Sequence, residues 1–203
     1  MKMKKYVLGA MLLLAGAACF ASGGNDREDD DFRDHSADNA PNSGLGFVVA
    51  GGGEFGGDEV ATIVYTDNST QSVKSGQGVT LAVGAHYRFA SQPIDIMGTL
   101  GYKYVTTRAS NANIYIGRVV AALQASYWFN DSWWVGLGPT WHLNNEFRGG
   151  QLVDNLKFDP ALGATLQVGW KFVALSYTNI HYTDQFKNKY NASNFGVMLI
   201  GRF

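Results

Sequence analysis

The sequence predicts an all-β fold, an eight-stranded antiparallel transmembrane β-barrel with up-and-down topology. Three observations support this prediction. Apolar and polar residues alternate with period two from Gly44 onward, which is typical of strands with two different faces. An apolar leader at the amino terminus indicates export. Charged residues make up only 16% of the chain, well below the roughly 25% of an average soluble domain.

Residues 1–21 have the layout of a signal peptide. Three lysines precede an apolar run at residues 7–18, which is shorter than the roughly 20 residues that a membrane-spanning helix needs. Small residues near its end predict cleavage after Ala21. Acylation at Cys19 is the alternative, but Gly16 stands where a lipoprotein signal has a bulky aliphatic residue. Cleavage after Ala21 removes the only cysteine, so no disulfide could stabilise the mature fold.

Residues 22–43 are predicted to form a flexible, acidic periplasmic arm. Seven acidic residues stand here against two arginines, and Phe32 is the only large apolar residue. Such a segment cannot bury enough apolar surface to offset the entropy of ordering. The spacing of its acidic residues does not match a calcium-binding loop.

Residues 44–203 are predicted to form the barrel. In the clearest strand, from Val79 to Phe89, the residues of one face are all apolar and those of the other are small or polar. Eight such strands are predicted, at residues 44–56, 76–89, 93–107, 114–129, 132–147, 159–170, 172–184 and 191–203. Each is long enough to cross a bilayer at a tilt.

The composition of the two faces predicts which face points outward. A soluble barrel keeps its apolar face inside and needs charges outside. Here the apolar face is nearly free of charge, and the polar face is too small and too rich in glycine to form a water-facing surface. No later segment has 18 consecutive apolar residues, so a membrane would be spanned by strands. The pattern therefore predicts an apolar outer wall and a polar interior.

The connections alternate in length, which predicts the orientation. Short ones occur at residues 90–92, at residues 130–131 and around Lys171, whereas residues 57–75 and 148–158 form longer loops. Short periplasmic turns opposite long external loops predict an outer-membrane location with both termini in the periplasm. Aromatic residues at the strand ends predict two girdles, a periplasmic one of Phe89, Phe129, Trp133, Trp170, Phe172 and Phe203 and an external one of Tyr104, Tyr115, Trp141, Tyr177 and Tyr182.

Three segments carry a family resemblance: residues 194–203, residues 175–180 and the Tyr87-Arg88-Phe89 strand end. They are similar to small outer-membrane barrels of the OmpA/OmpX type. The resemblance implies that Phe203, with Leu199 on the same face, forms the signal recognised by the barrel-assembly machinery. The sequence departs from the pattern at Gly201, where an aromatic residue is usual, and at Met198, where glycine is common.

Eight strands enclose only enough room for side chains, so a wide pore is not expected. The predicted inward-facing polar residues are Glu54, His86, Arg88, Asp95, Lys103, Arg118, Gln124, His142, Gln167, Lys171 and Arg202. Because unpaired buried charges are costly, we expect Glu54 to pair with Lys103 or Arg118. These residues predict a plugged polar lumen. A narrow ion path or a small ligand site is the alternative.

The predicted function is a structural or surface-interaction role without catalysis. An alternative comes from residues 176–179, which loosely resemble a segment of the lipid A 3-O-deacylase barrels, whose triad faces lipid. Ser176 and Thr178 stand where that family has histidine and serine, and no glutamate follows in the last strand. The implied partners are outer-membrane lipid, lipopolysaccharide and the barrel-assembly machinery. The sequence indicates no ligand for the external loops.

Metal, cofactor and nucleic-acid sites are not predicted. The four histidines are scattered without ligand spacing, and no glycine-rich phosphate motif precedes a helix. The predicted barrel also lacks a basic aromatic patch of the kind that binds nucleic acid.

Overall fold

The computed structural model of the chain describes residues 43–64, 70–109, 112–149 and 155–203. The predicted signal peptide lies outside the described residues, and so does the predicted acidic arm except for Ser43. Every regular element in the described part of the chain is a strand. No helix there is long and apolar enough to cross a membrane.

Eight strands form the barrel wall: β1 (Gly44–Gly56), β4 (Gly78–Arg88), β5 (Ile94–Ala109), β6 (Ala112–Trp128), β7 (Trp133–Arg148), β9 (Ala161–Trp170), β10 (Val173–Asn179) and β13 (Asn194–Arg202). Each wall strand pairs antiparallel with the next one along the chain, and β1 closes the ring by pairing with β13. The predicted eight-stranded antiparallel up-and-down barrel is therefore confirmed.

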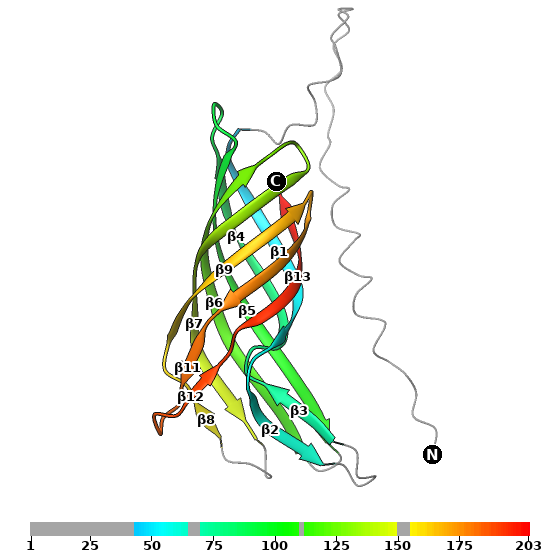
Figure 1. The fold of residues 1–203 in the computed structure, drawn as a ribbon, viewed down its shortest axis with the longest axis vertical. Helices are drawn as coiled ribbons and strands as arrows, with labels where there is room; N and C mark the ends of the chain where they lie inside the picture. Colours follow the sequence, from blue (N-terminus) through cyan, green and yellow to red (C-terminus); the bar gives the residue numbers. More distant parts are fainter. Residues whose placement is uncertain (1–42, 65–69, 110–111, 150–154) are drawn as a thin grey trace, which may run out of the picture. The chain divides into compact units, whose positions relative to one another are not determined.

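The two ends of the barrel differ. One end carries the tight connections at residues 89–93, 129–132 and 171–172, together with the carboxyl terminus, and we call it the short-turn end. The other, the long-loop end, carries the five remaining strands: β2 (Glu59–Val64), β3 (Thr70–Lys74), β8 (Leu156–Lys157), β11 (His181–Thr183) and β12 (Lys189–Asn191). In Figure 1 the short-turn end is at the top, and the wall strands are strongly inclined.

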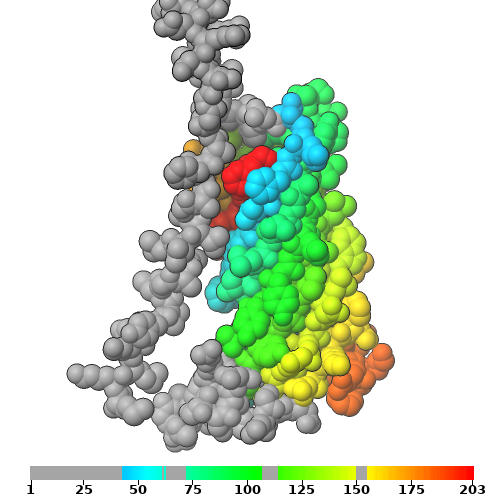
Figure 2. Space-filling view, turned by 180° about the vertical axis from the view of Figure 1, so that it is seen from behind, coloured from blue at the N-terminus to red at the C-terminus, as the bar shows by residue number. Residues whose placement is uncertain are grey.

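The strand register places apolar residues in one continuous row on the outer wall. Following paired residues once around the barrel from Leu45 leads back to β1 at Phe55, a stagger of ten residues. Every residue of this row is apolar or aromatic: Leu45, Tyr87, Ile96, Ala125, Leu137, Leu166, Tyr177, Phe195 and Phe55. Figure 2 shows part of this wall, where successive strands form neighbouring inclined bands.

The neighbouring row has the opposite character and points inward. It runs from Gly44 back to β1 at Glu54 and contains only glycine and polar residues: Gly44, Arg88, Asp95, Ser126, Gly136, Gln167, Ser176, Gly196 and Glu54. An apolar row outside and a polar row inside reverse the arrangement of a soluble barrel.

Three local features differ from the predictions. The first loop, residues 57–75, contains the β2–β3 hairpin. The seventh strand ends at Asn179, because β11 leaves the wall and pairs with β12. The period-two alternation predicted for residues 132–147 breaks at Asn144, which lies exposed at a bulge with φ 51°. The extra residue reverses the alternation, so that Asn145 and Phe147 are buried.

Candidate functional site in the barrel interior

The barrel interior is the candidate site because it collects most of the predicted lumen residues. Buried or half-buried positions are occupied by Glu54, His86, Arg88, Asp95, Lys103, Arg118, Gln124, His142, Gln167 and Arg202. Lys171 is an exception, because it lies exposed in the tight turn after β9 with φ 53°. The remaining charged groups form two separate clusters.

The first cluster is centred on Glu54, near the long-loop end. Its Oε2 atom lies 3.0 Å from the Nζ atom of Lys103 and accepts a hydrogen bond of 2.7 Å from the hydroxyl of Thr80. Lys103 is almost fully buried and Glu54 nearly so. Of the two cations expected to pair with Glu54, Lys103 is the one that forms the ion pair.

Arg118 has different partners. Its two terminal nitrogens donate to the carbonyl oxygens of Ser75 at 2.6 Å and Gln77 at 2.7 Å. Its guanidinium also lies 5.7 Å from the centre of the Tyr182 ring. Tyr182, expected in the external girdle, is buried and hydrogen-bonded to Nδ1 of His142. Tyr182 faces inward because β11 turns away from the wall after Ile180.

The second cluster lies near the short-turn end. Nδ1 of His86 and Oδ2 of Asp95 are 2.8 Å apart, and both residues are buried. The same carboxylate oxygen is 3.9 Å from Nε of Arg202. Arg88 is the direct cross-strand neighbour of Asp95.

Two tryptophans that sequence reasoning did not assign to the lumen site complete this second cluster. The Arg88 guanidinium lies 4.7 Å from the centre of the Trp128 ring, and the Arg202 guanidinium lies 5.3 Å from Trp128 and 4.5 Å from Trp134. A Cβ at Gly169 would be 2.0 Å from the Trp134 ring, so glycine is required there. The signal was present in the sequence, since Trp134 lies on the same face as Gly136 and His142.

Apolar residues are also buried within the barrel unit. One cluster, towards the short-turn end, contains Val48, Ala50, Met97, Trp128, Trp134, Ala174, Met198 and Ile200. The other gathers residues of the long-loop end: Val73, Ile114, Ile116, Phe147, Phe158, Ala161, Ile180, Tyr182 and Ala192. The interior is therefore not uniformly polar, because its charged groups lie among apolar side chains.

The β11–β12 hairpin is ordered around Asp184 at the long-loop end. Its carboxylate accepts hydrogen bonds from the backbone nitrogens of Phe186 and Asn188, from the Asn188 amide and from the Tyr190 hydroxyl. Burial alone would raise the pKa of Asp184, but these hydrogen bonds outweigh it and lower the pKa. Burial and the Asp184 charge raise the pKa of Tyr190.

Apart from Tyr182, the residues predicted for the girdles and the assembly signal lie on the outer wall. Exposed side chains there include Phe89, Phe129, Trp133, Trp170, Trp141, Tyr104, Leu199 and Phe203. Phe203 exchanges two backbone hydrogen bonds with Phe47, of 2.9 and 3.0 Å. Their rings stack at 4.9 Å, which ties the last residue to β1.

The residues of the deacylase-like segment do not form an outward-facing triad. Ser176 and Thr178 are buried on the inner face of β10, and Thr178 contacts Thr165 at 2.9 Å. His181 is exposed in β11. The lipid-facing arrangement implied by the resemblance is therefore not assembled from these residues.

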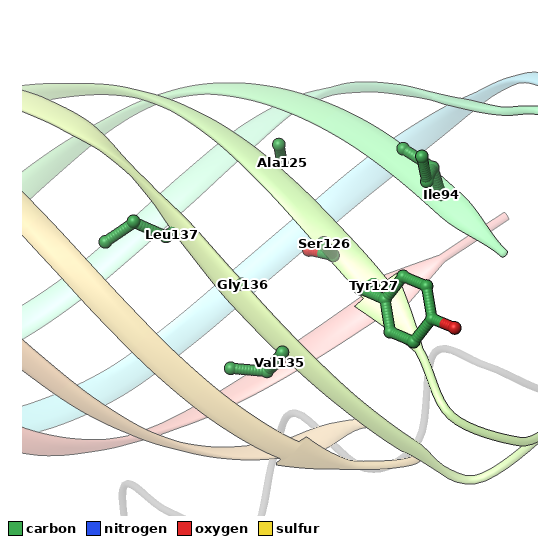
Figure 3. Close-up of a pocket in the computed structure, with 7 residues that line it drawn as sticks. All are labelled: Ile94, Ala125, Ser126, Tyr127, Val135, Gly136 and Leu137. Carbon is green, nitrogen blue, oxygen red and sulfur yellow. The ribbon is translucent and has the colours of Figure 1, made fainter.

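The outer wall has a shallow groove of about 250 Å³, lined by Ile94, Ala125, Ser126, Tyr127, Val135, Gly136 and Leu137. It arises because the outward-facing Ala125 is smaller than its neighbours (Figure 3). Ser126 is buried on the inner face, so the side chains that line the groove from outside are apolar or aromatic. In the described part of the chain, no three His, Cys, Asp or Glu side chains are grouped to hold a metal ion.

Comparison with known proteins gives a likeness of fold. No protein-family model matches the chain. No curated protein matches it either. Among solved structures, the chain is similar to Ail, the attachment invasion locus protein of Yersinia pestis, determined in complex with the heparin analogue sucrose octasulfate. The match has 12% sequence identity and a TM-score of 0.45, and it covers 79% of this chain and 99% of Ail.

An apolar row outside and a polar row inside distinguish a transmembrane barrel from a soluble one. This chain has the architecture of a transmembrane barrel, with eight antiparallel strands closed into a ring and an apolar outer wall, as the predicted fold class requires.

Proposed function

We propose that this chain is an outer-membrane barrel protein with a closed interior, which acts through its surface and not by catalysis. The observation that carries the proposal is the pair of adjacent rows, one entirely apolar outside and one entirely glycine or polar inside. Large hydrophobic side chains are exposed on every wall strand, whereas soluble monomers rarely expose a contiguous apolar patch larger than a few hundred Å². Lipid is the solvent that stabilises such an outer wall.

The contacts across the interior support a closed barrel. The Arg88–Trp128–Arg202–Trp134 stack lies in the lumen near the short-turn end. The Glu54–Lys103 pair and the Arg118 contacts occupy the region towards the long-loop end. Apolar residues of the wall strands and of the loops at the long-loop end form a further cluster beyond them. Because side chains occupy the interior in this way, the proposed function is a structural role or a role of the external loops.

The connections support the proposed orientation. The short-turn end would face the periplasm with both termini, and the long-loop end would face outward. The apolar wall would contact phospholipid and lipopolysaccharide, and the strand that ends at Phe203 would be read by the barrel-assembly machinery. The signal peptide at residues 1–21 would direct export.

Fractionation, electrophoresis and conductance measurements test this proposal. The protein should fractionate with outer membranes and migrate faster on a detergent gel before boiling than after it, because a closed barrel resists detergent. In planar bilayers the folded protein should be silent. Recovery as a soluble periplasmic monomer would contradict the membrane barrel. Steady conductance would contradict the closed interior, and lipid A that loses acyl chains in mass spectrometry would contradict the absence of catalysis.

A further inference from the structure

The short-turn cluster has more cationic groups than its acidic partner can neutralise. The guanidinium groups of Arg88 and Arg202 accompany a single carboxylate, that of Asp95, which is fully buried and already contacts His86 at 2.8 Å. Two guanidinium groups against one carboxylate leave the cluster with an excess of positive charge. An uncompensated buried charge is costly, because the protein interior screens it poorly.

Several N–H donors of this cluster also have no acceptor among the residues that the structure describes. These are Nη1 of Arg88, Nε and Nη2 of Arg202, and Nε1 of Trp128. All four atoms are shielded from solvent, and the Arg202 side chain is only 7% exposed. Buried donors in native proteins nearly always have an acceptor. Water could accept these hydrogen bonds, but it could not balance the charge.

The cluster around Glu54 serves as an internal comparison. It too has two cations, Lys103 and Arg118, beside one carboxylate. There, Arg118 places both terminal nitrogens on backbone carbonyls and Lys103 forms an ion pair with Glu54, although Nε of Arg118 and Nζ of Lys103 have no hydrogen-bond acceptor among the described residues. The short-turn cluster differs because its free donors lie on both guanidinium groups and on the Trp128 indole that both of them contact.

We propose that the short-turn cluster binds a small inorganic oxyanion, phosphate or sulfate. Two guanidinium groups and an indole N–H supply several donors with charge, which is what a tetrahedral oxyanion requires. The stacking of both arginines on Trp128 and Trp134 restricts their side chains before the anion binds. The bound anion would balance the excess charge and hold the β4, β6, β7 and β13 side chains together at this end.

Phosphate binding to the refolded full-length protein in a zwitterionic detergent tests this site. Sodium phosphate replaces sodium chloride at constant ionic strength, so that general screening is unchanged. Equilibrium dialysis with radiolabelled phosphate should give saturable binding of about one phosphate per barrel. The midpoint of thermal unfolding should rise over the same concentration range.

Substitutions locate the site. Arg88→Gln and Arg202→Gln should each weaken phosphate binding about tenfold or more, the loss expected for one charge-assisted hydrogen bond. Lys187→Gln removes an exposed cation on the β11–β12 hairpin and should leave binding unchanged. The gel-mobility shift shows which variants are folded.

Absence of saturable phosphate binding to the parent protein would overturn the proposal whatever the variants do. Binding that survives in both folded arginine variants would overturn it as well. Neither result would bear on the membrane location, which rests on the outer wall.

Discussion

Replacing Glu54 by glutamine tests the ionic contacts inside the barrel. Glu54 Oε2 lies 3.0 Å from Lys103 Nζ, and the two side chains are only 11% and 1% exposed. Glutamine keeps the volume and an oxygen that can accept the Thr80 hydrogen bond, so the main change is loss of charge. Lys103 and Arg118 would then remain as buried cations with no carboxylate beside them.

The expected loss of stability follows from this geometry. Two unit charges 3.0 Å apart attract by about 5–6 kcal/mol at an effective dielectric constant of about 20. Removing one partner of a buried pair costs about 3–5 kcal/mol, because the remaining charge stays buried. We expect Glu54→Gln to fall in this range, with water near the lumen acting to lower the cost. Replacing Lys103 by methionine in the same protein should restore much of the stability, since no lone charge is left.

Glu146 provides a matched control. Its Oε2 atom also lies 3.0 Å from its cationic partner, Arg148, but these side chains are 31% and 52% exposed. An exposed pair contributes about 0–1 kcal/mol, so Glu146→Gln should change stability little. Reversible denaturant unfolding in lipid vesicles, followed by tryptophan fluorescence, measures both variants. Equal, small losses for Glu54→Gln and Glu146→Gln would refute the reasoning.

Three further predictions concern the closing strand, the outer wall and the external hairpin. Deleting Phe203 should sharply reduce the amount of folded barrel in a gel-shift assay, whereas deleting residues 25–40 should not. Equal effects of the two deletions would contradict the division of the chain into an acidic arm and a barrel. Val83→Lys on the outer wall should lower the free energy of unfolding in vesicles by about 2–4 kcal/mol if Val83 lies at the bilayer midplane, and Leu45→Lys near the short-turn end should lower it by about 0–1 kcal/mol. No loss of stability in either variant would argue for a soluble barrel. Because the pKa of Asp184 is lowered on folding, the ionised carboxylate stabilises the hairpin at neutral pH, and this stabilisation is lost as the pH falls through the lowered pKa. Hydrogen-exchange protection of the β11–β12 hairpin should therefore fall in that acidic range. Unchanged protection would contradict the role given to Asp184.

Much of the fold could be predicted because its signal is local and repeated. Alternation with period two over eight segments specifies both the strands and their two faces. Short connections leave few arrangements other than neighbouring antiparallel pairs. The bounds of β1 agree with the predicted segment 44–56 at both ends. The closing strand β13, which ends at Arg202, then completes the ring with β1.

The interior contacts could be predicted only in part, because they depend on residues far apart in the sequence. Periodicity placed Glu54 and Lys103 on inward faces, yet the partners of Arg118 are carbonyl oxygens in the loop after β3, which no pattern reveals. The bulge at Asn144 reversed the faces locally without a Gly signal. Tyr182 resembled a girdle residue, but the chain leaves the wall after Ile180 and turns its ring inward.

The central claim, that lipid contacts the apolar outer face, is tested most directly by two neighbouring tryptophans. Trp133 is 50% exposed on the outer wall, whereas Trp134 is 0% exposed inside it. Single-tryptophan variants that retain one or the other can be refolded into vesicles containing lipids with brominated acyl chains, which quench fluorescence on contact. We predict strong quenching of Trp133 and little quenching of Trp134. Equal quenching of both, or quenching of Trp134 alone, would contradict the account.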